Sequence, residues 1–158
     1  MPLFLLLLAL VGGPPEPLLV FVAVPEPKAG ATVDDELVAA GRDIERAIDK
    51  RPTLRRAATR AEADVVVTVL ARGVTTSETG DYVFRSYPPP QVGPEARTWP
   101  AIKARVQAGR ASRIVIGEYA GRTDWQVCAE QIAKDIDGWT WGRRDRLIAA
   151  RTRRVTPP

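Results

Sequence analysis

Two apolar runs near the amino terminus, separated by a proline-rich break, constrain the fold of this chain more than any other feature. The first run covers residues 3–11 and the second covers residues 18–24. Prolines stand between them at Pro14, Pro15 and Pro17. Proline lacks a backbone N–H and clashes with the preceding helical turn, so a single helix through both runs is not expected. Neither run alone reaches the roughly 20 apolar residues that a membrane-spanning helix needs.

The first run has the length and composition of the hydrophobic part of a secretory signal. We therefore expect residues 1–17 to be a signal-like segment with a linker, and the protein to be periplasmic or secreted. No Lys or Arg precedes Leu3, so the basic residues of a typical signal would come from an upstream start codon. The alternatives are a retained N-terminal membrane anchor and a cytoplasmic chain.

The second run, Leu18 to Val24, is rich in β-branched and apolar residues and predicts a buried first strand. A helix is predicted next, over residues 33–50. Thr32 is its expected N-cap, and acidic residues fill its first turn. Apolar residues recur at spacings of three and four, which gives the helix one core-facing stripe, and Pro52 prevents its continuation.

Further strands and one further helix follow from the same reasoning. The most hydrophobic stretch, residues 64–76, lacks alternation and predicts a central strand that is buried on both faces. Residues 102–107 alternate between apolar and polar side chains, which favours a strand over the competing short helix. A helix with Thr123 or Asp124 as its cap is expected to run to about residue 140. The remaining predicted strands are 54–58, 82–87 and 113–119.

These elements predict an α/β fold, more strictly α+β. We expect a single mixed β-sheet of about five or six strands with two main helices packed on one face. The domain covers residues 18–150, with Leu147 and Ile148 in a final packed turn, and residues 151–158 are a solvated basic tail.

The composition excludes several kinds of chemistry. The chain has no histidine, which rules out a Ser-His-Asp triad and every imidazole metal site. Its only cysteine, Cys128, lies on the apolar stripe of the second helix and is expected in the core. The carboxylates near turns, at Glu78, Asp81, Glu118 and Asp124, lack a metal-binding spacing. We therefore predict no enzyme, no cofactor and no metal.

The residues with the best prospect of binding a partner lie near the carboxyl end. Trp139 and Trp141 are two positions apart, so they cannot share one helical face, and one of them is expected to be exposed unless Gly138 breaks the helix. Arg143, Arg144 and Arg146 follow directly and add positive charge. An Arg-rich end of this kind is compatible with an anionic partner or with a solvated helix end.

The segment from Leu18 to Val67 resembles a bacterial envelope module. Its strand, helix, short strand and the sequence Ala63-Asp64-Val65-Val66-Val67 are similar to the amino-terminal α/β domain of periplasmic TolB and of CsgG-type lipoproteins. Propeller repeats and a lipid-attachment cysteine, which belong to those proteins, are missing here. The resemblance implies an exported, non-enzymatic domain that binds another envelope protein, and it transfers no catalytic residue.

Three functions follow for testing. The first is an exported, non-enzymatic binding or assembly module of the bacterial cell envelope. The second is a polyanion binder that holds nucleic acid or anionic lipid through the Arg-rich end, since the net charge is +4. The third is a small enzyme that works through carboxylates without histidine. The sequence leaves the partner and the oligomeric state open, as well as whether any strand presents a free edge.

Overall fold

The computed structural model describes residues 15–27, 34–78, 81–86, 97–119 and 124–155. The elements in chain order are β1 (Leu18–Ala23), α1 (Asp35–Asp49), β2 (Leu54–Arg56), β3 (Val65–Glu78), β4 (Asp81–Ser86), β5 (Arg97–Ala108), β6 (Ala111–Glu118), α2 (Trp125–Thr140), the 3-10 turn η1 (Trp141–Arg143) and α3 (Arg144–Val155). The signal-like run at 3–11 lies outside the described residues. Among the helices that are described, none is long and apolar enough to cross a membrane.

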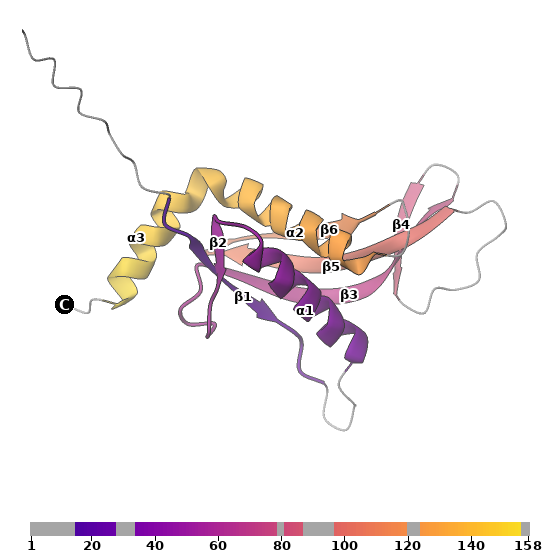
Figure 1. The fold of residues 1–158 in the computed structure, drawn as a ribbon, viewed down its shortest axis with the longest axis horizontal. Coiled ribbons are helices and arrows are strands. Elements are labelled where there is room, and N and C mark those ends of the chain that lie inside the picture. Colours follow the sequence, from indigo (N-terminus) through magenta and orange to yellow (C-terminus); the bar gives the residue numbers. More distant parts are fainter. Residues whose placement is uncertain (1–14, 28–33, 79–80, 87–96, 120–123, 156–158) are drawn as a thin grey trace, which may run out of the picture.

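The strands form one six-stranded mixed sheet in the order β2-β1-β3-β5-β6, and β4 pairs with β3. β1 runs parallel to both β2 and β3, whereas β3, β5 and β6 pair in antiparallel fashion. β3 is long enough to take β1 along its first half and β4 along its second half, while β5 follows its other edge (Figure 1). The predicted mixed sheet and the assignment of the second apolar run to a strand are both confirmed.

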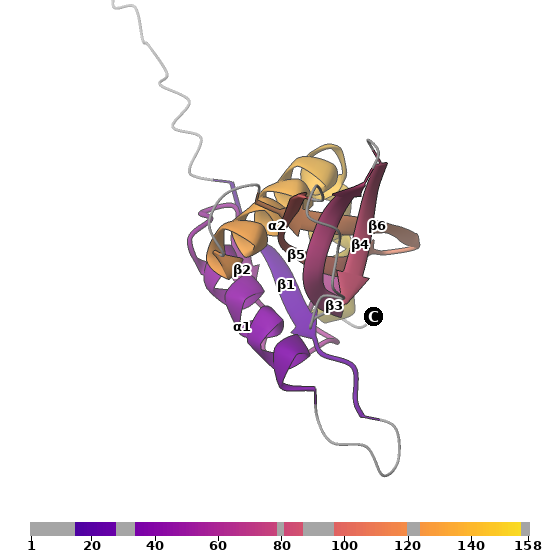
Figure 2. The ribbon, with the colours of Figure 1, turned by 90° about the vertical axis from the view of Figure 1, so that its right-hand side faces the viewer.

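The core lies between this sheet and the two long helices. Figure 2 shows α1 and α2 on one side of the strands. From α1, Ile44 and Ile48 are fully buried, and from α2, Ile132 and Ile136 are fully buried. They meet the alternate residues of the strands that face the helices, which include Leu18, Val20, Val65, Val67, Val69, Ile102, Ala104 and Val106. Cys128 is buried among them, as predicted.

Two local predictions are corrected by the structure. Asp34, not Thr32, caps α1, and its carboxylate accepts the backbone N–H groups of Glu36 and Leu37 at 3.0 and 3.3 Å. β5 begins at Arg97 and includes Pro100, so it starts earlier than the strand predicted at residues 102–107. Proline is tolerated there because its backbone faces the end of β6, where the Pro100 carbonyl accepts the N–H of Tyr119.

The carboxyl end also differs from the expected solvated tail. Residues 144–155 form the third helix, α3, and Arg151 is only 13% exposed within it. The apolar signal in this helix is weak, since Leu147 and Ile148 are its main contacts with the core. Arginines attach the helix to the domain in addition to these two apolar residues, and a hydrophobic pattern does not predict such contacts.

Candidate functional site

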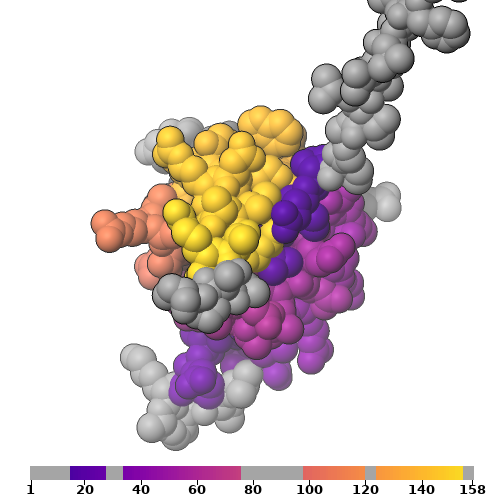
Figure 3. All heavy atoms as spheres, turned by 90° about the vertical axis from the view of Figure 1, so that its left-hand side faces the viewer, coloured from indigo at the N-terminus to yellow at the C-terminus, as the bar shows by residue number. Residues whose placement is uncertain are grey.

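Arginines of α3 bind the residues just before β1 and the turn before β3. The Arg151 guanidinium donates to the Asp64 carboxylate at 2.7 Å and to the Pro17 carbonyl at 3.3 Å, and it also pairs with Glu16. Arg154 donates to the carbonyls of Ala61 and Ala63, each at 3.2 Å. Figure 3 shows α3 lying beside the start of β1. Arg151 and Arg154 therefore stabilise the fold by holding α3 against the rest of the domain.

Asp64 is the centre of this arrangement. Its side chain is fully buried, and it accepts the backbone N–H of Leu19 at 2.9 Å in addition to the two arginines. Burial raises the pKa of the Asp64 carboxyl above its ordinary value of 3.8, an effect that outweighs the opposing influence of the Leu19 N–H, Arg151 and Arg154. Asp64 thus ties β1, β3 and α3 together.

The raised pKa of Asp64 predicts a specific pH dependence of stability. The folded protein holds this proton more tightly than the unfolded chain does, so the free energy of unfolding should fall as pH rises from about 4 through the folded pKa. Asp64→Asn removes the titrating group. Urea unfolding of both proteins between about pH 4 and about pH 7 should show the wild type losing stability relative to Asp64→Asn. A difference that stays constant over this range would contradict the assignment.

The predicted binding residues at the end of α2 do not gather into one site. Trp141 is 64% exposed, whereas Trp139 packs against the core, so the expectation that one of the pair is exposed is met. Helix α2 continues through Gly138 to Thr140. Arg143 lies over the Trp139 ring at 5.0 Å and donates to the Trp139 carbonyl, and Arg146 is exposed.

Arg144 is the exception among them because it is buried. It is only 6% exposed, and its Nη2 donates to the backbone carbonyls of Glu16 and Thr53 at 2.6 and 3.0 Å. In this position the guanidinium fixes the chain that enters β1. Of the six arginines from 143 to 154, Arg144 and Arg151 are largely enclosed by the protein's own chain. The other four are exposed, although Arg143 and Arg154 also donate to backbone carbonyls.

A second charged cluster lies between the helices and the sheet. The register of β3 against β5 shifts between Val69 and Ala71, and this bulge turns Arg72 toward the helices. Arg72 pairs with Glu36 at 2.9 Å and with Asp43 at 3.4 Å, and its guanidinium lies 4.1 Å from the centre of the Trp125 ring. The cluster joins α1, β3 and α2, and its charges are matched within the fold.

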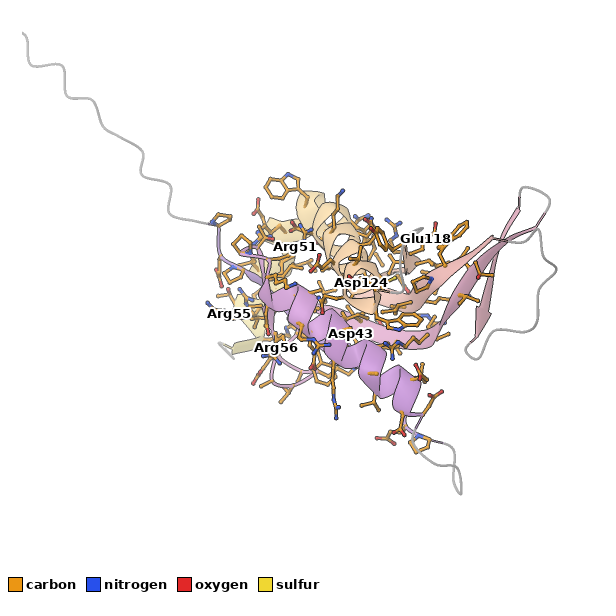
Figure 4. All side chains as sticks on the ribbon, turned by 45° about the vertical axis from the view of Figure 1, so that its right-hand side comes forward. Asp43, Arg51, Arg55, Arg56, Glu118 and Asp124 are labelled. Atoms are coloured by element: carbon orange, nitrogen blue, oxygen red, sulfur yellow. The ribbon has the colours of Figure 1, made fainter. Side chains whose placement is uncertain are left out.

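The carboxylates that sequence reasoning considered for catalysis are separate from one another or engaged elsewhere. Glu118 accepts the Trp99 indole N–H at 3.2 Å, and Asp124 caps α2 through the N–H groups of Gln126 and Val127. Figure 4 shows both near the start of α2 and Asp43 on α1. The side chains of Glu78 and Asp81 lie outside the described part. Among the described side chains, no three His, Cys, Asp or Glu residues gather as metal ligands.

Cys128 is the one thiol of the chain, and its surroundings make it inert. Its Sγ lies 3.2 Å from the Pro100 carbonyl oxygen, and burial raises the pKa of the thiol to about 12. We expect no reaction of the folded protein with an aromatic disulfide reagent at about pH 8, and one thiol titrated per chain after denaturation. Rapid labelling of the folded protein would contradict this environment.

The face of the sheet away from α1 and α2 carries two exposed isoleucines of β6. Val115 and Gly117 of β6 face α2, so Ile114 and Ile116 point to the other face, where they are 43% and 40% exposed. Arg105 of β5 lies beside Ile114 and is exposed. Sequence reasoning missed this surface because residues 114–116 are all apolar, which is typical of a strand buried on both faces.

Comparison with known proteins adds little to this geometry. No protein-family model matches the chain, and no curated protein matches it. Among solved structures, the solution structure of an uncharacterized lipoprotein B from Nitrosomonas europaea is similar at 15% sequence identity, over 85% of this chain and 81% of that chain, with a TM-score of 0.32. A likeness of that size carries no argument about the role of this chain.

Proposed function

We propose that this chain is an exported, non-enzymatic binding or assembly module of the bacterial cell envelope, and that it binds its partner at β5 and β6. One observation carries the binding role. Ile114 and Ile116, which a two-layer fold would normally cover or replace by polar residues, are exposed on the open face. The charges of the clusters around Asp64 and Arg72 are paired within the fold, and neither cluster presents a nucleophile beside a base.

Export is supported by the way the fold divides the two apolar runs. The second run is used as β1, which begins at Leu18 and enters the core. The domain thus has its own first strand without the run at 3–11, which remains available as a targeting segment.

The rival polyanion binder would depend on the exposed arginines of this end, and three of them, Arg143, Arg146 and Arg153, make no contact with Asp64. A truncation after Ala150 would not test it cleanly, because it removes Arg151 and with it an ion pair to buried Asp64. Replacing those three arginines by serine is the better test of that rival. Binding to heparin or DNA that weakens steeply with salt and is lost in this variant would favour it over the envelope module.

Export can be tested by fusing residues 1–17 to alkaline phosphatase, which is active only after translocation. We expect phosphatase activity in cells that carry the fusion. The matched control replaces Leu6 and Leu8 by arginine, which interrupts the apolar run and should abolish the activity. An inactive fusion with the natural sequence would contradict the proposal.

A further inference from the structure

β6 stands at one end of the sheet, and its outer edge has no strand beside it in the part of the chain that the structure describes. It pairs with β5 alone, over its full length from Ala111 to Glu118. Edge strands are usually guarded by proline, lysine, a bulge or a covering loop, since their free N–H and C=O groups invite pairing. The eight residues of β6 contain neither proline nor lysine, and their two charged residues, Arg113 and Glu118, stand near its ends.

Exposed apolar side chains accompany this free edge. The large hydrophobic residues that are exposed in the described structure are Ile114, Ile116, Tyr119 and Trp141, and all except Trp141 lie on β6 or directly after it. A strand added to β6 would cover both isoleucines from the side. One added β-strand would therefore both pair with the free backbone groups and cover the exposed isoleucines.

The charges around β6 are divided between its two ends. Arg110 and Arg113 lie at its start and are exposed. Glu118 and Asp124 lie at its end. An antiparallel copy of the same strand would bring the basic end of each copy beside the acidic end of the other, whereas a parallel copy would place like charges together.

We propose that two copies of this chain pair through their β6 edges in antiparallel fashion, about a two-fold axis at Val115. Ile114 of each copy then lies opposite Ile116 of the second copy, and Ser112 lies opposite Glu118. The two sheets become one continuous sheet across the axis. This inference rests on the proposed function, because it names the partner of the same surface.

The test is sedimentation velocity of the protein as cells produce it, from about 1 µM to about 300 µM. A small interface of this kind gives a weak dimer, with an expected dissociation constant on the order of 10 µM. Ile114→Lys should weaken the dimer at least about tenfold, because it places a charge against Ile116 of the second copy. Ile114 is 43% exposed, so this variant should keep the circular dichroism spectrum and unfolding midpoint of the wild type. Arg153→Ala, an exposed position on α3 outside the proposed strand pairing, should dimerise normally.

The register is tested by two substitutions at one exposed position. Ser112→Lys should tighten the dimer about threefold because it pairs with Glu118 of the second copy, and Ser112→Glu should loosen it by a similar factor. These signs oppose the effect of overall charge: the chain already carries +4, so an added lysine raises general repulsion and an added glutamate lowers it. The predicted order of affinities therefore reports the specific contact.

Three results would overturn the inference. They are a monomer at every concentration, a dimer that Ile114→Lys does not affect, and a reversed order of the two Ser112 variants. If the protein is a monomer at every concentration, a strand of a different protein is the remaining candidate to pair with the free edge. The phosphatase fusion does not depend on β6, so loss of the dimer with normal export would leave the proposed envelope role standing.

Discussion

Replacing Arg151 by alanine is expected to lower the free energy of unfolding by about 3–5 kcal/mol, the usual cost of removing one partner from a buried ion pair. Arg151 is 13% exposed and binds the fully buried Asp64 carboxylate at 2.7 Å. Without it, that carboxylate keeps only the Leu19 N–H at 2.9 Å and the more distant Arg154 at 3.4 Å. Urea unfolding at about pH 7 measures the loss.

Arg153 offers a matched control on the same helix. It lies two residues from Arg151 and is exposed, so Arg153→Ala should change stability by no more than about 0.5 kcal/mol. Equal losses for the two substitutions would contradict the special role given to the ion pair between Arg151 and Asp64. A small effect of both would contradict the role given to Asp64.

Replacing Gly117 by alanine is expected to cost about 3 kcal/mol or more, at the upper end of the range for overpacked cores. Gly117 of β6 lies under α2, and a Cβ atom there would collide with the carbonyl oxygen of Cys128 and lie 2.8 Å from Cγ1 of Ile132. A backbone oxygen cannot turn away as a side chain can, so β6 and α2 would have to separate. Thermal and urea unfolding would both report the loss.

Gly138 provides the comparison for this glycine. It lies in α2, and a Cβ atom at Gly138 meets nothing within 4 Å. Gly138→Ala should therefore stabilise the protein by up to about 1 kcal/mol, since alanine is the better helix former. If Gly117→Ala were as harmless as Gly138→Ala, the close approach of α2 to β6 would be wrong.

The fold was largely predictable because its signals are local. Leu18–Val24 and the stretch after Asp64 are short continuous apolar runs, which are typical of buried strands. The stripe that holds Ile44 and Ile48 has the period of a helix. The cap at Asp34 was missed because several polar residues precede α1 and any of them can serve as a cap. Helix α3 was missed because its attachment depends on ion pairs between residues about 90 positions apart.

The candidate site was less predictable than the fold. A charge run does not reveal which arginines turn inward, and Arg144 and Arg151 do so only because the entry to β1 offers free carbonyls and a carboxylate. Likewise, an apolar strand does not reveal whether it lies at the centre or at the edge of a sheet. That position depends on strand order, which placed β6 outermost and left Ile114 exposed.

The N-terminal residue of the native protein, determined by sequencing the chain purified from fractionated cells, tests the central claim most directly. We expect a periplasmic or secreted chain whose first residue lies after Val11 and no later than Glu16, which Arg144 and Arg151 bind. A chain that starts at Met1 and is found in the cytosol would contradict it.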